Sequence, residues 1–234
     1  MFSNNSSPQM TVVREESAIQ ALQALQALQA LYQERKEAIQ KRLAEFRQVM
    51  EWKDEEVFAE LCFCLLTPQS SAKVCWEAVT ALKERTLLLK GQPQELEPHL
   101  RSVRFSDSKA KYIVEARDMF SNDGKLQLKS RISSFYNPFE LREWLVENVK
   151  GLGYKEASHF LRNIGLGEGF AILDRHILRN LDRLGVITEI PVSITKKRYL
   201  EIEEKLRRFA TEIGIPLADL DLLFWSKETG WIFK

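Results

Sequence analysis

The sequence contains few cysteines, almost no net charge and no long apolar run. Its three cysteines, Cys62, Cys64 and Cys75, do not form a plausible disulfide framework, so we expect reduced thiols. The 34 Lys and Arg residues are balanced by 33 Asp and Glu residues, and the net charge of +1 means that any nucleic-acid surface must be a local feature. Neither a charged head before an apolar stretch nor an apolar run of about 18 residues occurs, so no secretory signal or membrane span is predicted. We therefore expect a cytoplasmic protein with no membrane contact.

Apolar residues recur at intervals of three and four along most of the chain, which is the period of an α-helix. In residues 57–65, for example, Val57, Leu61, Cys64 and Leu65 share one face. Residues that favour turns separate about ten such segments. No alternating run predicts a half-buried strand. The predicted fold class is therefore all-α.

The N-terminal region differs from the rest of the chain in composition. Residues 1–14 are rich in Ser and Asn, and we expect them to be flexible. Residues 15–54 consist largely of good helix formers and predict a long helix. Its leucines at 22, 25, 28 and 31 are three residues apart, so they spread over about half of the helix surface. A helix extension or packing arm fits this pattern; a coiled coil stays open although no heptad is kept.

A reversal at residues 151–153 interrupts the helical pattern of residues 140–164. Apolar faces on both sides of Gly151 and Gly153 predict two helices joined by a tight hairpin. Glycines at both positions allow positive φ, and the amide groups that open the second helix form an anion-binding nest. A DNA phosphate fits such a nest. The alternative is a simple turn in which glycine caps the first helix.

Lys155 lies two residues after this hairpin, and Asp174 lies nineteen positions later, since 174 − 155 = 19. A Gly-hydrophobic-Gly hairpin with a lysine and an aspartate at these spacings resembles the helix-hairpin-helix DNA glycosylase superfamily. Within it, residues 55–234 resemble the second, mostly archaeal-type family of 8-oxoguanine DNA glycosylase/AP lyases. The segments that carry this resemblance are "LTPQSSAK", "KGLGYKEASHFLRNIG", "AILDRHIL" and "LLFWSKETGWIFK".

The resemblance implies a two-lobed helical glycosylase fold with an extra N-terminal helix. We expect residues 15–54 to pack with the C-terminal lobe and residues 55–185 to form the central lobe that includes the hairpin. Residues 186–234 would supply the C-terminal helices and a base-recognition tail. The implied function is a bifunctional DNA repair enzyme that excises 8-oxoguanine and nicks the strand. Its implied partner is double-stranded DNA containing 8-oxoguanine, on which it would act as a nucleoid-associated monomer.

The chemistry of Lys155 and Asp174 suits this reaction. Breaking the bond between a purine and its sugar passes through an oxocarbenium-like state, which needs a carboxylate nearby and a nucleophile at the anomeric carbon. An attacking lysine forms a Schiff base, which then permits β-elimination of the 3′ phosphate. Burial, the helix N-terminus and Lys150 favour the neutral amine, Asp174 opposes them, and we expect the neutral form to prevail.

Each of these residues also has an ordinary structural interpretation. Lys155 could be a solvated surface lysine, and Asp174 could be a helix N-cap, a role that is compatible with catalysis. Lys150 is the rival nucleophile, although a cation at the end of the preceding helix needs no further role. His159, one turn beyond Lys155, is expected to pack between helices.

Further residues are expected to contact the opened duplex. Gln69 stands at an exposed corner and could fill the space left by a flipped nucleotide; an ordinary loop amide is the alternative. Arg175 and His176 open the helix after Asp174 and could contact phosphates, or they could simply be solvated.

The C-terminal segment offers groups that could recognise the base. Oxidation turns N7 of guanine from an acceptor into a donor, so an acceptor aimed there would select the lesion. Trp225 could stack on the base, and Asp219 or Asp221 could accept a hydrogen bond; core packing and a solvated helix face are the alternatives. The resemblance adds the side chain and carboxylate of Lys234, and therefore sensitivity to C-terminal tags.

No cofactor is predicted. Some members of the superfamily that the chain resembles carry an iron–sulfur loop with four cysteines near the C-terminus. No cysteine follows Cys75 in this chain, so no such cluster is expected. No catalytic metal is needed, although hairpin carbonyls could hold a monovalent cation. Two other functions stay open, namely a glycosylase of the same superfamily for a different lesion and a non-catalytic helix-hairpin-helix DNA-binding module.

Overall fold

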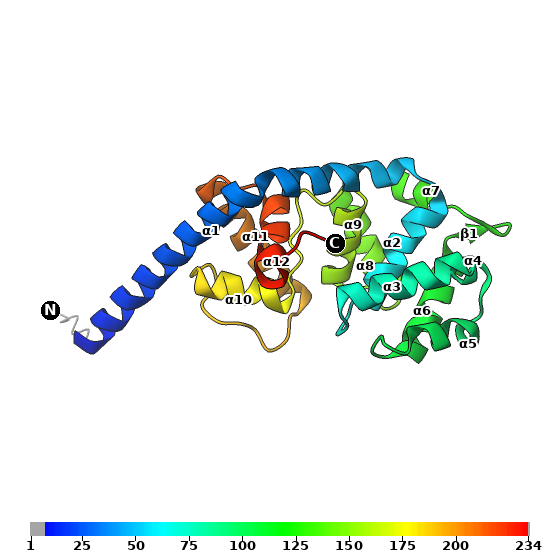
Figure 1. The fold of residues 1–234 in the computed structure, drawn as a ribbon, viewed down its shortest axis with the longest axis horizontal. Helices are drawn as coiled ribbons and strands as arrows, with labels where there is room; N and C mark the ends of the chain where they lie inside the picture. Colours follow the sequence, from blue (N-terminus) through cyan, green and yellow to red (C-terminus); the bar gives the residue numbers. More distant parts are fainter. Residues whose placement is uncertain (1–7, 234) are drawn as a thin grey trace. The chain divides into compact units, whose positions relative to one another are not determined.

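The computed structural model describes the backbone of residues 8–233 and the side chains of residues 19–233. The described chain is helical apart from one small β-hairpin, which confirms the predicted all-α class (Figure 1). The α-helices are α1 (Pro8–Gln48), α2 (Asp54–Leu66), α3 (Ala72–Glu84), α4 (Leu87–Lys90), α5 (Pro93–Leu96), α6 (Ser106–Met119), α7 (Leu128–Ser133), α8 (Pro138–Asn148), α9 (Tyr154–Asn163), α10 (Arg175–Arg183), α11 (Lys196–Ile213) and α12 (Leu217–Thr229). The short 3-10 helices are η1 (Val49–Glu51) and η2 (Glu97–Leu100), and the antiparallel strands are β1 (Ser121–Asn122) and β2 (Lys125–Leu126).

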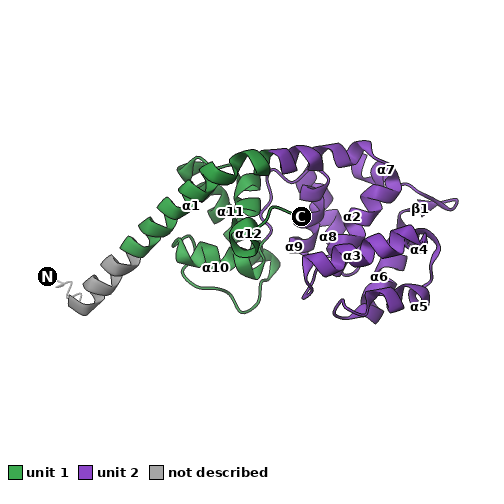
Figure 2. Cartoon of the chain, in the orientation of Figure 1, with its two compact units in different colours: residues 1–40, 173–233 green, residues 41–172, 234 purple. Residues whose placement is uncertain are grey.

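Packing divides the described chain into two compact units (Figure 2). Unit 1 contains residues 8–40 and 173–233, and unit 2 contains residues 41–172. The sequence places its boundaries after residues 14, 54 and 185, at changes in composition and at turns, whereas the units follow contacts between helices. Helix α1 begins at Pro8, so it includes residues 8–14, which the sequence analysis placed before the long helix. Proline is tolerated there because the first turn of a helix needs no amide donor.

Helix α2 forms the centre of unit 2. Every residue from Val57 to Leu66 is buried, and helices α3, α6, α7 and α9 contact this helix. A helix that is apolar on all sides is stable only when neighbours cover it completely. The buried carboxylate of Glu60 accepts a hydrogen bond from Asn163 Nδ2 at 3.1 Å, which links α2 to the end of α9. Helix α9, and the hairpin that precedes it, are therefore fixed against the core.

Unit 1 is built from α10, α11, α12 and part of α1. Tyr32 donates a hydrogen bond to Asp219 Oδ2 at 2.8 Å, and Gln40 Nε2 donates to the same oxygen at 2.6 Å. Arg35 donates to the carbonyl of Ser226 at 2.6 Å, so three side chains of α1 hold α12. Within the described part of the chain, no helix is long and apolar enough to cross a membrane.

Candidate active site

The hairpin between α8 and α9 depends on one glycine with a left-handed backbone. Gly151 has φ +88°, and a Cβ atom there would lie 2.4 Å from Cδ2 of Tyr112, so both conformation and packing exclude a larger residue. Gly153 instead has the extended backbone of a helix N-cap (φ −92°, ψ −177°), so the positive φ that glycine allows is not used at this position. An extended backbone is open to any residue.

The hairpin can present amide groups to an anion. The first amides of a helix have no acceptor within the helix. Gly153 precedes α9 and offers no side chain that could accept from them. A hydrogen bond of 3.1 Å from the Leu152 amide to the Val149 carbonyl closes the turn, and the Leu152 side chain is buried. The start of α9 therefore has the geometry of a phosphate-binding helix terminus.

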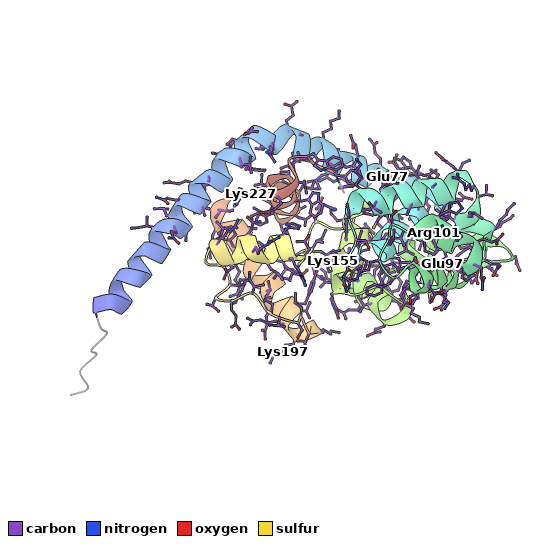
Figure 3. All side chains as sticks on the ribbon, turned by 60° about the horizontal axis from the view of Figure 1, so that its bottom comes forward. Glu77, Glu97, Arg101, Lys155, Lys197 and Lys227 are labelled. Carbon is purple, nitrogen blue, oxygen red and sulfur yellow. The ribbon has the colours of Figure 1, made fainter. Side chains whose placement is uncertain are left out.

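Lys155 lies in the first turn of α9 (Figure 3). Its side chain is only 23% exposed, which argues against a freely solvated lysine. Nζ lies 3.4 Å from Oγ1 of Thr67, the residue that ends α2, and 3.5 Å from Oε1 of Glu156. The amine is thus held between the ends of two helices in unit 2.

Lys150, the rival nucleophile, has a different environment. Its side chain is 63% exposed, and Nζ lies 3.2 Å from Oε1 of Glu115 on α6. The same ammonium group lies 5.6 Å from the centre of the Tyr112 ring. These surface contacts account for Lys150 without a chemical role.

Asp174 is the N-cap of α10 in unit 1. Its Oδ1 accepts a hydrogen bond of 2.8 Å from the Ile177 amide. This is the capping role that the sequence offered as an alternative, and it leaves one carboxylate oxygen available. Among the described residues, no group donates a hydrogen bond to Oδ2. A capped carboxylate is held rigidly, which suits an electrostatic role.

The loop between α2 and α3 is held from inside the protein by Lys109. This lysine is 3% exposed, and its Nζ donates to the carbonyls of Leu66 and Pro68, both at 2.7 Å, and lies 3.3 Å from Ser70 Oγ. Burial lowers the pKa of Lys109. Gln69 is exposed at the tip with φ +56°. A left-handed glutamine is strained, and it is kept in place by the bonds on either side of it.

Phe105 is a candidate residue that the sequence analysis missed. It precedes α6 with φ +62°, and its side chain is 55% exposed. The amide of its neighbour Arg104 donates to Ser70 Oγ at 3.0 Å, so the Phe105 loop adjoins the Gln69 loop. Two exposed, left-handed residues therefore occupy adjacent loops. Nothing in the sequence signals this, because the contact joins residues 34 positions apart.

His176 has a partly exposed side chain that contacts residues of both α10 and α12. Its Nδ1 lies 3.0 Å from Nη2 of Arg179 and 3.5 Å from Oε2 of Glu228. The imidazole ring meets the ring of Trp225 edge to face, with centroids 5.6 Å apart. Burial raises the pKa of Glu228, but hydrogen bonds from Asn180 and His176 outweigh it and lower the pKa overall. Arg175, by contrast, is exposed at the start of α10.

The acids of α12 are buried, so the alternative of a solvated helix face is wrong for both. Asp219 is 1% exposed, and its Oδ2 accepts the two bonds from α1 described above. Burial and the hydrogen bond to Asp219 raise the pKa of Tyr32 to about 12. Asp221 is 8% exposed, and Nε1 of Trp225 is buried without a hydrogen-bond partner in the described chain. Lys234 lies outside the described residues.

His159 packs between helices, as expected. It is 6% exposed, and its ring meets Phe63 of α2 edge to face at 5.4 Å between centroids. Within residues 19–233, no group of three or more His, Cys, Asp or Glu side chains is arranged to hold a metal ion.

Known proteins resemble the chain over most of its length. A family model described as 8-oxoguanine DNA glycosylase matches residues 39–215. A protein of Fusobacterium nucleatum subsp. nucleatum, named 8-oxoguanine DNA glycosylase/AP lyase, is 48% identical over 204 residues, which cover 87% of this chain and 94% of that protein.

Solved structures of 8-oxoguanine glycosylases are also similar to the chain. The crystal structure of the 8-oxoguanine DNA glycosylase of Thermotoga maritima has a TM-score of 0.81 and 38% identity, covering 92% of this chain and 100% of that one. The Methanocaldococcus jannaschii 8-oxoguanine glycosylase/lyase, in complex with 15mer DNA containing 8-oxoguanine, has a TM-score of 0.81 and 39% identity, covering 90% and 99%. The hairpin, Lys155 and Asp174 all lie within the residues that the family model matches.

Proposed function

Because this chain belongs to the 8-oxoguanine DNA glycosylase family, we propose that it excises 8-oxoguanine from double-stranded DNA and then cleaves the strand by β-elimination. The family that the sequence predicted is thereby confirmed. The observation that carries the proposal is the environment of Lys155, whose side chain is only 23% exposed directly after the glycine hairpin. A glycosylase that also acts as a lyase needs such an amine.

Lys155 is the nucleophile in this proposal. The electron pair of Nζ forms a bond to C1′ of the deoxyribose, and the base leaves with the pair of the glycosidic bond. The resulting Schiff base acidifies the C2′ proton, and its loss expels the 3′ phosphate. Asp174, capped by the Ile177 amide, stabilises the positive charge that develops on the sugar. The amides at the start of α9 bind a backbone phosphate.

Several further residues contribute to recognition of the lesion in this proposal. A glycosylase must extrude the damaged nucleotide, and Gln69 with Phe105 would support the opened duplex because both are exposed on adjacent loops. Trp225, Asp221 and Lys234 would recognise the base. We assign Asp219 to holding α1, because its carboxylate already accepts bonds from Tyr32 and Gln40. Arg175 is exposed and suits a phosphate contact, whereas His176 supports Trp225 from α10.

In this proposal the protein is a monomer that needs no cofactor, and it acts on the nucleoid in the cytoplasm. Lysine chemistry needs neither a metal nor an iron–sulfur cluster. A monovalent cation bound by hairpin carbonyls is a further part of the proposal. Replacing potassium by tetramethylammonium at equal ionic strength should then weaken duplex binding, and light scattering with a size-exclusion column would measure the oligomeric state.

Borohydride trapping tests the proposed function. The wild type and a Lys150→Gln variant should give a covalent adduct with a duplex that contains 8-oxoguanine, whereas Lys155→Gln should give none. Duplexes with alkylated purines or oxidised pyrimidines identify a different lesion if only they yield an adduct. Binding of the duplex without an adduct for any lesion would favour a non-catalytic DNA-binding module.

A further inference from the structure

Glu156 lies beside the amine of Lys155 although the two residues are neighbours in the sequence. Successive residues of a helix point in different directions, so their side chains rarely meet. Here Oε1 of Glu156 lies 3.5 Å from Nζ of Lys155. The Glu156 side chain is 14% exposed, less than that of Lys155 itself. The carboxylate therefore lies near the start of α9, and the side chains of both residues are largely buried.

Capping of α9 does not account for this position. A glutamate in the first turn of a helix usually reaches back to the amide of a capping Ser or Thr. The N-cap of α9 is Gly153, and no hydrogen bond joins Glu156 to a backbone amide among the described residues. Its second oxygen, Oε2, would lie 3.1 Å from a Cβ atom built on Gly153. Because Gly153 has no Cβ atom, it leaves room for the carboxylate, which lies beside the Lys155 amine.

The other groups around the amine cannot take its proton. Thr67 is a neutral hydroxyl whose own proton goes to the Cys64 carbonyl at 2.9 Å. Lys109 is bound to the carbonyls of the α2–α3 loop and carries positive charge of its own. Burial raises the pKa of Cys75 to about 11, so this thiol stays protonated. Glu156 is the one carboxylate that forms an ion pair with Lys155 among the described residues.

We infer that Glu156 is a catalytic residue that takes a proton from Lys155 before the amine attacks the sugar. An N–H bond of the ammonium group breaks, its electron pair stays on Nζ, and an O–H bond forms on Oε1. That pair on Nζ then forms the bond to C1′ while the base departs. The separation of 3.5 Å must shorten to hydrogen-bond distance, which is common when substrate binds. This role rests on the proposed function of Lys155.

Replacing Glu156 by glutamine separates this role from simple charge pairing, because the two predict opposite effects. Removing a negative charge beside the amine favours the neutral amine, so a mere ion-pair partner would give faster attack at neutral pH. Loss of a proton acceptor would instead slow the attack by about 100-fold. Single-turnover excision, followed at saturating enzyme on an 8-oxoguanine duplex from pH 6 to pH 10, measures the difference.

We expect Glu156→Gln to be about 100-fold slower than the wild type at pH 7 and to recover as the pH rises, because solvent then removes the proton. Affinity for the duplex should be unchanged. Glu97→Gln is a matched control, since it removes one negative charge from an exposed side chain of η2 in the same unit (Figure 3). That variant should keep both the rate and the pH profile of the wild type.

A second variant protects the test against a folding defect. Glu156→Ala should be slow, and added formate should restore part of its rate because a small carboxylate can occupy the vacated space. An excision rate for Glu156→Gln equal to or above that of the wild type, with an unchanged pH profile, would overturn the inference. Absence of formate rescue in a folded Glu156→Ala variant would do the same. If the wild type itself forms no borohydride adduct, the proposed function fails instead.

Discussion

Replacing Lys109 by methionine removes the ammonium group that holds the α2–α3 loop. Two bonds of 2.7 Å to the carbonyls of Leu66 and Pro68 are lost, and a hydrogen bond from a charged group contributes about 1.5–3 kcal/mol. Leu66 keeps one partner, the Cys75 thiol at 3.2 Å, and the Pro68 carbonyl keeps only the long hydrogen bond of 3.5 Å from the Ser70 hydroxyl. Burying the ammonium group has its own cost, which the variant recovers. We therefore expect the free energy of unfolding to fall by about 2 kcal/mol.

The same substitution should slow catalysis. Thr67, which lies 3.4 Å from the Lys155 amine, and Gln69 both belong to the loop that Lys109 holds. A displacement of about 1 Å in a positioning group can slow a reaction by about 100-fold. We expect slower single-turnover excision and weaker binding of a duplex with a lesion. A preformed abasic site should be less sensitive to the loss of Gln69, since no base has to be flipped from it.

Urea unfolding and single-turnover kinetics measure the two effects side by side. Lys111→Met is the matched control, because Lys111 is on the same helix and is 53% exposed. Among the residues whose side chains are described, it forms only a surface ion pair with Asp107. This control should change stability by no more than about 0.5 kcal/mol and leave excision unaffected. The reasoning is refuted if Lys109→Met matches the control in both stability and rate.

Three further substitutions have expected outcomes. Gly151→Ala should lower the free energy of unfolding by about 3 kcal/mol in urea titrations, because it adds a left-handed alanine and a contact of 2.4 Å with Tyr112. A variant as stable as the wild type would contradict the hairpin geometry. Phe105→Gly should change the free energy of unfolding by no more than about 0.5 kcal/mol, because glycine fits the left-handed backbone. It should weaken binding to a lesion duplex about 10-fold in fluorescence anisotropy, because an exposed side chain that can stack on a base is lost; unchanged affinity would exclude Phe105 from the DNA surface. Tyr32→Phe should be less stable than the wild type at pH 8, and this difference should disappear between pH 10 and pH 12. Folding raises the pKa of Tyr32 from 10.0 to about 12, so the stabilising effect of the tyrosine is lost as the pH rises through that range. A difference in stability that persists at pH 12 would contradict the bond to Asp219.

The sequence predicted the parts of the site that depend on local pattern. Helical periodicity on both sides of Gly151, together with turn residues, was sufficient to place the hairpin and Lys155 at the start of a helix. The capping role of Asp174 could be predicted for the same reason, since a cap involves residues three positions apart. For Gly153 the pattern left the backbone conformation open, because no sequence pattern separates a glycine with an extended backbone at an N-cap from a glycine in a left-handed turn.

Contacts between distant segments could not be predicted in this way. Lys109 has an ordinary position in a helical pattern, and only the fold shows that its amine reaches carbonyls about 40 positions earlier. The sequence left Asp219 as either an acceptor for the base or part of a solvated helix face, whereas its partners Tyr32 and Gln40 come from a helix at the other end of the sequence. A buried carboxylate needs such partners, and they are invisible until the two helices are placed together.

Because Asp219 joins α12 to α1, residues of α1 support the helix that carries Trp225. Helix α12 carries Trp225 and leads into the C-terminal tail, and its first turn is held by Tyr32 and Gln40 of α1. Its last turn is held by Arg35 through the Ser226 carbonyl. Because both ends of α12 depend on α1, a change in residues 32–40 should alter the helix that carries the proposed base-recognition residues, even where the change touches no DNA. The N-terminal helix is therefore part of the support of the proposed base pocket rather than a separate appendage.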